Sequence, residues 1–218
     1  MTARSLRVTA TALGVVASIL LTACGGESEP KDEKIAGAEQ GNGDKASESP
    51  KVSSSPAAGR PRIDLPSDLK YDFEWAKTGD KDKDAVLHDT EQFVKAVDLA
   101  IVEQNPLHKA YRFYSEGEAA AGSEKFIQEF VDYKDTITGS KRFYGPRVGI
   151  KRDGTASLVY CEDQSRSYNK SLKTGKVDKT SVTKNSFVVY SSRLRTNKDG
   201  IWVTEELTSQ RGSAACQR

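Results

Sequence analysis

Residues 146–165 read PRVGIKRDGTASLVYCEDQS, and this stretch decides the fold. Apolar and polar residues alternate on both sides of Asp153 and Gly154, a pair that suits the positive φ angles of a tight hairpin turn. Residues 185–209, NSFVVYSSRLRTNKDGIWVTEELTS, repeat the pattern around a second Asp-Gly pair. The C-terminal half of the chain is therefore predicted to form antiparallel hairpins, and residues 136–144, TITGSKRFY, predict one more strand.

Upstream of the hairpins the apolar period changes from two residues to 3.6. Residues 84–105, DAVLHDTEQFVKAVDLAIVEQN, carry apolar residues at helical spacing, and Asn105 followed by Pro106 ends the run. The residues of this stripe are Val86, Phe93, Val97, Ala100 and Ile101. One long helix is predicted here.

Two further helices are expected before the first strand of the hairpins. Residues 107–115 predict a short helix with one apolar side, made of Leu107, Ala110, Tyr111 and Tyr114. A third helix is expected to begin at Ser123 as its N-cap and to bury Phe126, Ile127, Phe130 and Val131. Ahead of all three, residues 68–75, DLKYDFEW, alternate as in an extended segment on the core or a leading strand. Helices followed by hairpins predict an α+β fold.

The first 62 residues have a different composition. Arg4 and Arg7 precede an apolar run of about fourteen residues that is too short to span a bilayer, which takes roughly 20. Leu21-Thr22-Ala23-Cys24 resembles the bacterial lipobox, so residues 1–23 are predicted to be a lipoprotein signal peptide and Cys24 to carry lipid. The alternative is a chance cysteine at an ordinary cleavage site. Residues 25–62 lack aromatic residues and predict a disordered tether after Cys24, so that 24–62 is one segment.

Residues 63–218 have the length of one domain. With Cys24 assigned to lipid, Cys161 and Cys216 remain as an even pair in an oxidising compartment, and we expect them to form a disulfide. Two separately buried thiols are the alternative.

The order of elements and several local segments resemble a group of actinobacterial secreted lipoproteins. The segments are the lipobox, DLKYDFEWAKTGD, AYRFYS, YCEDQS, KTGKV and the terminal cysteine. Those proteins are similar in fold to nuclear transport factor 2-like domains, in which three N-terminal helices pack on a bent antiparallel sheet to form a cone. The resemblance implies little about activity, because the fold includes ketosteroid isomerase, dehydratases and many non-catalytic domains, and it often forms homodimers through its sheet.

The chain offers few groups for metal or nucleophilic chemistry. Its two histidines, His88 and His108, are far apart in sequence and have no recognisable ligand or triad context, so neither a metal nor a cofactor is expected. An acid or base in the cone is the enzymatic interpretation worth keeping. The residues that could serve are Tyr111, Tyr114, Asp132, Tyr133, Tyr144, Tyr160 and Asp163, and we take Tyr111, Tyr114 and Asp163 as the candidate pocket.

Charge is distributed unevenly along the domain. Residues 63–135 hold 9 basic and 17 acidic side chains, whereas residues 136–218 hold 16 basic and 7 acidic ones. One interpretation is attraction between an acidic helical layer and a basic sheet. The other is an anion-binding patch centred on Arg166, Lys170, Lys173 and Lys176. Nucleic acid is excluded as a partner by the expected compartment, so anionic lipids and envelope polymers are the anions to consider.

These observations together predict an extracellular lipoprotein anchored to the outer face of a cytoplasmic membrane. The favoured role is non-catalytic binding of an envelope polymer, a protein partner or a small apolar ligand. An isomerase-like or dehydratase-like enzyme is the alternative. An open cone with converging polar groups indicates a pocket, and a cone filled by apolar side chains indicates a scaffold.

Overall fold

The computed structural model describes residues 59–217. The predicted signal peptide, Cys24 and the tether up to residue 58 lie outside the described residues. Within residues 59–217 the chain forms three α-helices and six strands. The helices are α1 (Lys81–Val102), α2 (Lys109–Phe113) and α3 (Gly117–Tyr133). The strands are β1 (Leu69–Phe73), β2 (Asp135–Ile150), β3 (Thr155–Ser171), β4 (Val177–Asp178), β5 (Phe187–Thr196) and β6 (Trp202–Arg211).

All six strands belong to one sheet. The strand order is β1-β2-β3-β5-β6, and the short β4 pairs with β3. Both predicted hairpins are present, with Ile150 opposite Ala156 in the first and Thr196 opposite Trp202 in the second. The leading segment is a strand, as one of its two interpretations had it, but it runs parallel to β2. The sheet is therefore mixed and mostly antiparallel, because a strand that reaches β2 through three helices can enter in the same direction.

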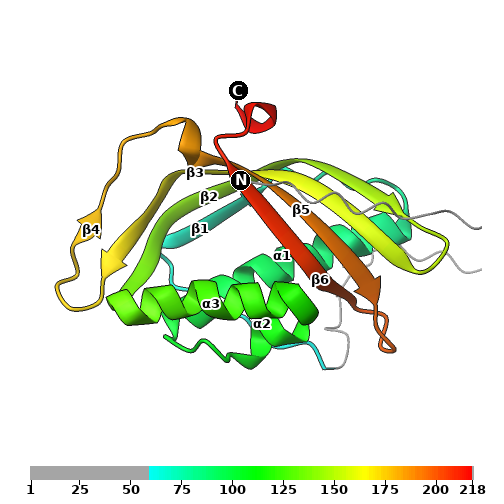
Figure 1. The fold of residues 1–218 in the computed structure, drawn as a ribbon, viewed down its shortest axis with the longest axis horizontal. Helices are drawn as coiled ribbons and strands as arrows, with labels where there is room; N and C mark the ends of the chain where they lie inside the picture. Colours follow the sequence, from blue (N-terminus) through cyan, green and yellow to red (C-terminus); the bar gives the residue numbers. More distant parts are fainter. Residues whose placement is uncertain (1–58, 218) are drawn as a thin grey trace, which may run out of the picture. The chain divides into compact units, whose positions relative to one another are not determined.

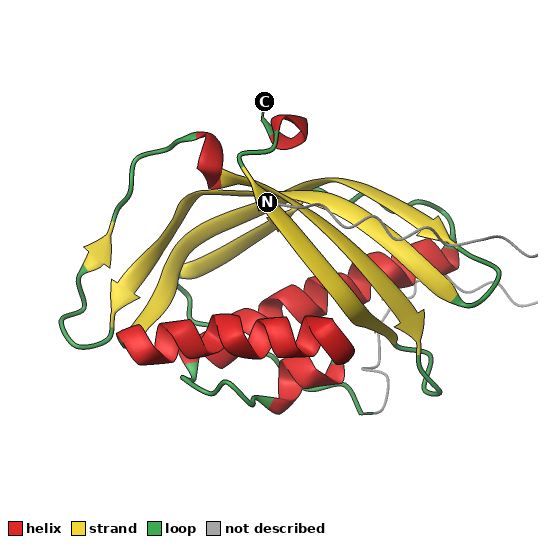
Figure 2. Cartoon of the chain, viewed as in Figure 1, coloured by secondary structure: helices red, strands yellow, loops and turns green. Residues whose placement is uncertain are grey.

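The helices lie together on one side of the curved sheet. Figures 1 and 2 show α1, α2 and α3 on the concave side, and the short C-terminal 3-10 helix η2 (Ala214–Cys216) on the opposite, convex side. This arrangement confirms the expected α+β class. It also agrees with the layout that the nuclear transport factor 2-like resemblance implies.

Two predictions about the helices are wrong in detail. The third helix begins at Gly117, six residues before the expected N-cap Ser123, because the segment Ala119-Ala120-Ala121 has high helix propensity. Phe126 is not buried as expected: it is 43% exposed. In the second helix Leu107 precedes the first turn and is 57% exposed, so it does not share the buried side of Tyr111 and Tyr114.

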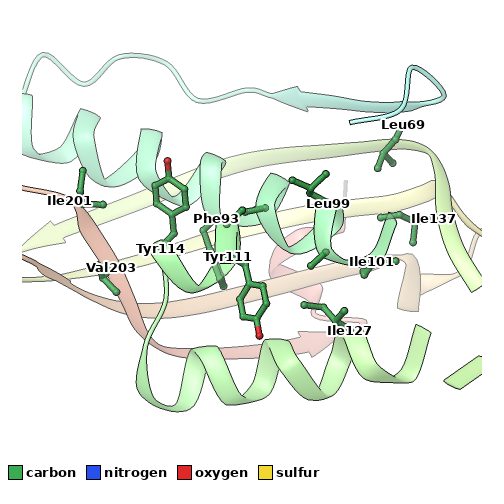
Figure 3. Packing of buried hydrophobic residues seen from close by; sticks show 13 residues of the cluster. Leu69, Phe93, Leu99, Ile101, Tyr111, Tyr114, Ile127, Ile137, Ile201 and Val203 are labelled. Carbon is green, nitrogen blue, oxygen red and sulfur yellow. The ribbon is translucent and has the colours of Figure 1, made fainter. Parts of the chain in front are cut away.

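The space beneath one part of the sheet is closely packed. A cluster that we call the filled core joins buried residues of α1, α2, α3 and three strands, as Figure 3 shows. Its members include Leu99, Ile101, Ala110, Tyr111, Tyr114, Ile127, Ile137, Ile201 and Val203. Burial of this apolar surface stabilises the fold by about 25 cal/mol per Å² removed from water.

The sheet bends where its strands lose register. The β2–β3 pairing shifts between Ser140 and Arg142 and again between Tyr144 and Arg147, which is how bulges curve a sheet. The close approach of β2 and β3 also requires a glycine at position 139. Gly139 has φ +102°, and a Cβ atom there would lie 2.0 Å from the backbone oxygen of Arg166. The first irregularity falls beside Lys141, which faces the helices.

The convex face carries a small second cluster held by a disulfide. Cys161 of β3 is bonded to Cys216 of η2, as the cysteine count predicted, with 5.5 Å between the two Cα atoms. Tyr144, whose hydroxyl donates to the Cys216 carbonyl, packs there with Phe187 and Val189. The C-terminal segment therefore covers part of the sheet face through which the resemblance implied dimerisation.

Candidate functional site

A cavity of about 380 Å³ lies between α1, α3 and the concave side of the sheet. We call it the concave cavity. Most of its wall is apolar or aromatic, and the side chains come from α1, α3 and four strands. The apolar and aromatic lining residues are Phe93, Val94, Val97, Ala119, Phe126, Phe143, Tyr160, Val188, Tyr190 and Leu207. Cavities of this size with an apolar wall and a few polar groups are typical of small-molecule sites.

Polar side chains form a row that begins at Tyr71, outside the cavity, and continues along its wall. The Tyr71 hydroxyl donates to Asp98 Oδ2 over 2.7 Å. Lys141 Nζ donates to both carboxylate oxygens of Asp98 over 2.8 Å each. Asp98 is 2% exposed and Lys141 9%, so this ion pair is almost fully removed from water. Each charge therefore depends on the other for compensation.

The row continues from Lys141 to the far side of the cavity. Lys141 Nζ lies 3.9 Å from Glu162 Oε1, beyond hydrogen-bond distance. Gln164 Nε2 donates to Glu162 Oε2 over 2.8 Å, and Arg211 donates to Gln164 Oε1 over 2.7 Å. Glu162 is 3% exposed, and its Oε1 makes no hydrogen bond of ordinary geometry among the described residues, although the Tyr190 hydroxyl interacts with this carboxyl. We call Tyr71, Asp98, Lys141, Glu162, Gln164 and Arg211 the polar row.

Burial and charge act in opposite directions along the row. Burial raises the pKa of the Glu162 carboxyl, and the neighbouring Lys141 and Gln164 only partly oppose this. Burial lowers the pKa of the Lys141 ammonium, but the attraction of Asp98 and Glu162 outweighs it, so the pKa lies above its ordinary value. Burial, followed by the charge of Glu162, also raises the pKa of Tyr190 well above its usual range. Glu162 is thus a carboxyl of the row whose neutral form is favoured.

Local structure explains how these side chains come to face the cavity. Asp98 lies three residues before Ile101 and four after Val94, so it falls on the apolar stripe of α1. On β3, Tyr160 and Glu162 are two residues apart and share the concave face, as alternation along a strand requires. Asp98 and Glu162 therefore occupy positions at which the helical and strand periodicities predict buried apolar residues.

The three residues of the predicted pocket do not meet. Tyr111 donates its hydroxyl to the Pro106 carbonyl over 2.6 Å, and the Tyr114 hydroxyl accepts a hydrogen bond from Arg60. Figure 3 shows the two hydroxyls pointing in opposite directions within the filled core. Asp163, next along β3 after Glu162, accepts from Arg142 over 3.2 Å and does not line the concave cavity.

Among the other residues named from the sequence, Tyr160 does line the cavity. It is buried, and its ring stacks on Tyr190 with 5.2 Å between centroids. Sequence reasoning missed Asp98, Lys141 and Glu162. The sequence signal that could have identified these residues was a charged side chain on an otherwise apolar face of a predicted helix or strand.

The predicted anion patch lies at the end of β3 and in the turn that follows. Lys170 forms an ion pair with Asp68 over 3.2 Å. Arg166, Lys173 and Lys176 are exposed and have no carboxylate partner within residues 59–217. These three side chains are available to a soluble anion.

Two further features concern residues 59–217. In that part of the chain no group of three His, Cys, Asp or Glu side chains is placed to hold a metal ion. None of the helices described there is long and apolar enough to cross a membrane.

Comparisons with known proteins give likenesses of fold. No protein-family model matches the chain, and no curated protein matches it. The solved structures that are similar include the intermembrane space region of the chloroplast protein ARC6, with 13% identity over 59% of this chain and 95% of that one, and a TM-score of 0.38.

Two enzyme-related structures are similar to the same extent. A ketosteroid isomerase-like protein from Erwinia carotovora atroseptica has 10% identity over 62% of this chain and 98% of that one, with a TM-score of 0.41. The hexachlorocyclohexane dehydrochlorinase LinA-type3 from Novosphingobium barchaimii LL02 has 8% identity over 60% and 88%, with a TM-score of 0.40. At such low identities and TM-scores these likenesses carry no argument about function.

Proposed function

We propose that the domain binds a small, mostly apolar molecule in the concave cavity, with Glu162 bonded to a polar group of that molecule. The observation that carries this proposal is Oε1 of Glu162, a buried carboxyl oxygen in the wall of a cavity of about 380 Å³ that makes no hydrogen bond of ordinary geometry within residues 59–217 and has Lys141 Nζ at 3.9 Å. Buried polar atoms are nearly always paired, so an unpaired one beside an open cavity indicates a place for a ligand. Among the three partners expected from the sequence, this favours the small apolar ligand.

The neutral dye N-phenyl-1-naphthylamine tests the proposal. Its fluorescence rises in apolar surroundings, and we expect saturable, one-to-one binding to the purified protein. Gly122 of α3 lines the cavity, and a Cβ atom there would meet nothing within 4 Å. Gly122→Leu is expected to fill part of the cavity and to lower the affinity for the dye roughly tenfold. The reason is that forced overlap between the leucine side chain and the dye costs about 1–3 kcal/mol.

Gly122→Ala is the matched control, because it makes the same backbone change with a side chain too short to fill the cavity. It should bind the dye as the wild type does. Equal affinity in wild type and Gly122→Leu would contradict the proposal, as would the absence of saturable binding to the wild type.

Proton transfer on the bound molecule is a second candidate function, and the raised pKa of Glu162 favours it. In its ionised form Glu162 would take a proton from the carbon beside a ligand carbonyl and return a proton to the same or a neighbouring carbon. The probe is 2-tetralone in D₂O, followed by the loss of its α-proton signal in NMR spectra. Exchange faster with wild type than with Glu162→Gln supports an isomerase-like activity, and equal rates exclude this role for Glu162.

The location remains the one that the sequence predicts, and we propose a lipid anchor at Cys24 on the outer face of the cytoplasmic membrane. Supporting it are the lipobox and the Cys161–Cys216 disulfide, which suits an oxidising compartment. In a bacterium that processes lipoproteins, wild type should incorporate labelled palmitate and sediment with membranes. Cys24→Ser should do neither, and its retention on membranes would contradict the anchor.

The basic side chains after β3 support a weaker, separate proposal of contact with anionic lipids or envelope polymers. Arg166, Lys173 and Lys176 would each contribute about 1 kcal/mol near a charged surface. Purified protein with the Cys24→Ser change should bind phosphatidylglycerol vesicles at low salt and release them at high salt. Binding that is independent of salt would remove this proposal.

A further inference from the structure

We propose that the molecule bound in the concave cavity carries an oxyanion, such as a carboxylate, sulfonate or phosphate ester, and that Arg211 binds this group at the mouth. This inference rests on the proposed function and adds the chemical class of the ligand. It follows from the position of Arg211, its hydrogen bonds and the shape of the space around it.

Arg211 stands where two cavities meet. The concave cavity and a second cavity of about 300 Å³, under the C-terminal part of α3, share four lining residues. These are Phe126, Lys141, Gln164 and Arg211. A polar group held there would leave the apolar remainder of a ligand inside the concave cavity.

The guanidinium of Arg211 has capacity for a ligand. Its Nη1 donates to Gln164 Oε1 over 2.7 Å and to the Asn185 carbonyl over 3.2 Å, and both acceptors are neutral. Within residues 59–217 it forms no ion pair with a carboxylate, whereas Arg193 and Arg195 on the neighbouring strand β5 are both paired with glutamates. An arginine has five N–H donors in a fixed fork, which matches the geometry of a carboxylate or phosphate.

Arg211 is also held in position from inside the protein. Gln164 accepts from Arg211 and donates to Glu162, so the exposed guanidinium is connected to the buried carboxyl through one side chain. This connection directs the guanidinium toward the cavity mouth. It also separates the proposed anion from Glu162 by the length of Gln164, so a neutral polar group of the ligand can reach Glu162 while the charge of the ligand stays beside Arg211.

The acidic residues nearby limit where the anion can lie. Asp98 is neutralised by Lys141, and Glu118 lies close enough to Arg193 to act on the pKa of that guanidinium. Glu129 and Asp135 line the second cavity and would repel an anion placed deeper under α3. Arg211 itself is therefore the favourable position.

A matched pair of dyes tests the inference. N-phenyl-1-naphthylamine and 8-anilino-1-naphthalenesulfonate have the same rings and differ by one sulfonate. We expect the sulfonate dye to bind the wild type roughly tenfold more tightly at low salt, as one charge-assisted hydrogen bond provides. Arg211→Gln should remove this advantage and leave the neutral dye unchanged, and Arg211→Lys should restore part of it.

Two controls define where the anion binds. Arg152→Gln removes an equal charge from the exposed turn between β2 and β3 and should leave both dyes unchanged, and Gly122→Leu should weaken binding of both if they occupy the concave cavity. Decanoate and decyl phosphate should displace the sulfonate dye at concentrations at which decanol does not, and their order ranks a carboxylate against a phosphate.

The outcomes separate this inference from the proposed function. Equal affinity for the two dyes, or an Arg211→Gln variant that keeps the preference, overturns the anion site while binding of the neutral dye still supports the cavity. A preference lost equally in Arg152→Gln also overturns it. If neither dye binds saturably, the proposed function and this inference both fail.

Discussion

The two regions beneath the sheet differ in how they are occupied. In the filled core, α2 carries Tyr111 and Tyr114 into contact with aliphatic side chains, and both residues are essentially inaccessible to solvent. In the concave cavity, α1 and α3 lie over the sheet without filling the space, and its wall contains an ion pair and a carboxyl of which one oxygen, Glu162 Oε1, lacks a hydrogen bond. One domain thus contains both a scaffold and a pocket.

The difference lies in what each region does with its polar groups. In the filled core the side-chain hydroxyls of both tyrosines are hydrogen-bonded. The Tyr111 hydroxyl donates to the Pro106 carbonyl, and the Tyr114 hydroxyl accepts from Arg60. In the cavity the polar row keeps Glu162 Oε1 unpaired, at a cost to stability of about 1–3 kcal/mol for a buried acceptor. A fold that needed only stability would gain by an apolar residue at this position.

The largest expected effect is on the ion pair of the cavity. Lys141→Met leaves Asp98 buried without its counter-charge, and we expect the free energy of unfolding to fall by about 3–5 kcal/mol. Urea denaturation measures this directly. The double variant Asp98→Leu with Lys141→Met should recover most of the loss, because an apolar pair of similar volume removes both charges. A double variant as unstable as the single one would contradict this reading of the pair.

A truncation in the filled core is expected to cost slightly less. Ile127 is fully buried and does not line either cavity, so Ile127→Ala should lower the free energy of unfolding by about 2–5 kcal/mol. Under conditions in which the variant is folded, its affinity for N-phenyl-1-naphthylamine should equal that of the wild type. Loss of dye affinity in this variant would show that the two regions are not independent.

Removal of the disulfide tests whether the convex side of the sheet influences the cavity on the concave side. Cys161 and Cys216 are separated by 55 residues, and a closed loop of that length contributes up to about 4 kcal/mol in the chain-entropy model. Cys161→Ala with Cys216→Ala should therefore lower the thermal midpoint without changing dye binding. A changed affinity would show that the C-terminal segment influences the cavity through the sheet.

The smallest effect concerns the protonation of Glu162. Its pKa is raised by burial, so the folded state favours the protonated form, and stability falls as pH rises above the ordinary carboxyl pKa of about 4.3 and through the raised value. Glu162→Gln removes this dependence. The free energy of unfolding of the variant minus that of the wild type should be larger at neutral pH than at pH 4. Urea titrations at a series of pH values measure this difference. A stability difference that does not vary with pH would contradict the raised pKa.

Periodicity and turn chemistry predicted most of the elements of the domain. The long helix, both hairpins and the pairing of Cys161 with Cys216 follow from local spacing, Asp-Gly turns and cysteine counting. The start of α3 was missed because a cap residue, Ser123, was given more weight than the alanine-rich turn before it. Caps are a local preference, and a run of strong helix formers continues through them.

The site was less predictable for a physical reason. The polar row takes residues from β1, α1, β2, β3 and β6, which meet only because the sheet bends around the helices. Sequence reasoning chose Tyr111 and Tyr114 by their residue type, but their helix carries them into the filled core. Asp98 on the stripe of α1 and Glu162 on the inward face of β3 were the better indications, since a charge at a core position needs a partner.

The most direct measurement is the titration of N-phenyl-1-naphthylamine into Gly122→Leu and Ile127→Ala, with the free energy of unfolding determined for both. Independent regions require opposite results: Gly122→Leu keeps its stability and loses the dye, whereas Ile127→Ala loses stability and keeps the dye. Dye affinity that follows stability in both variants would contradict the division into a filled core and an open cavity.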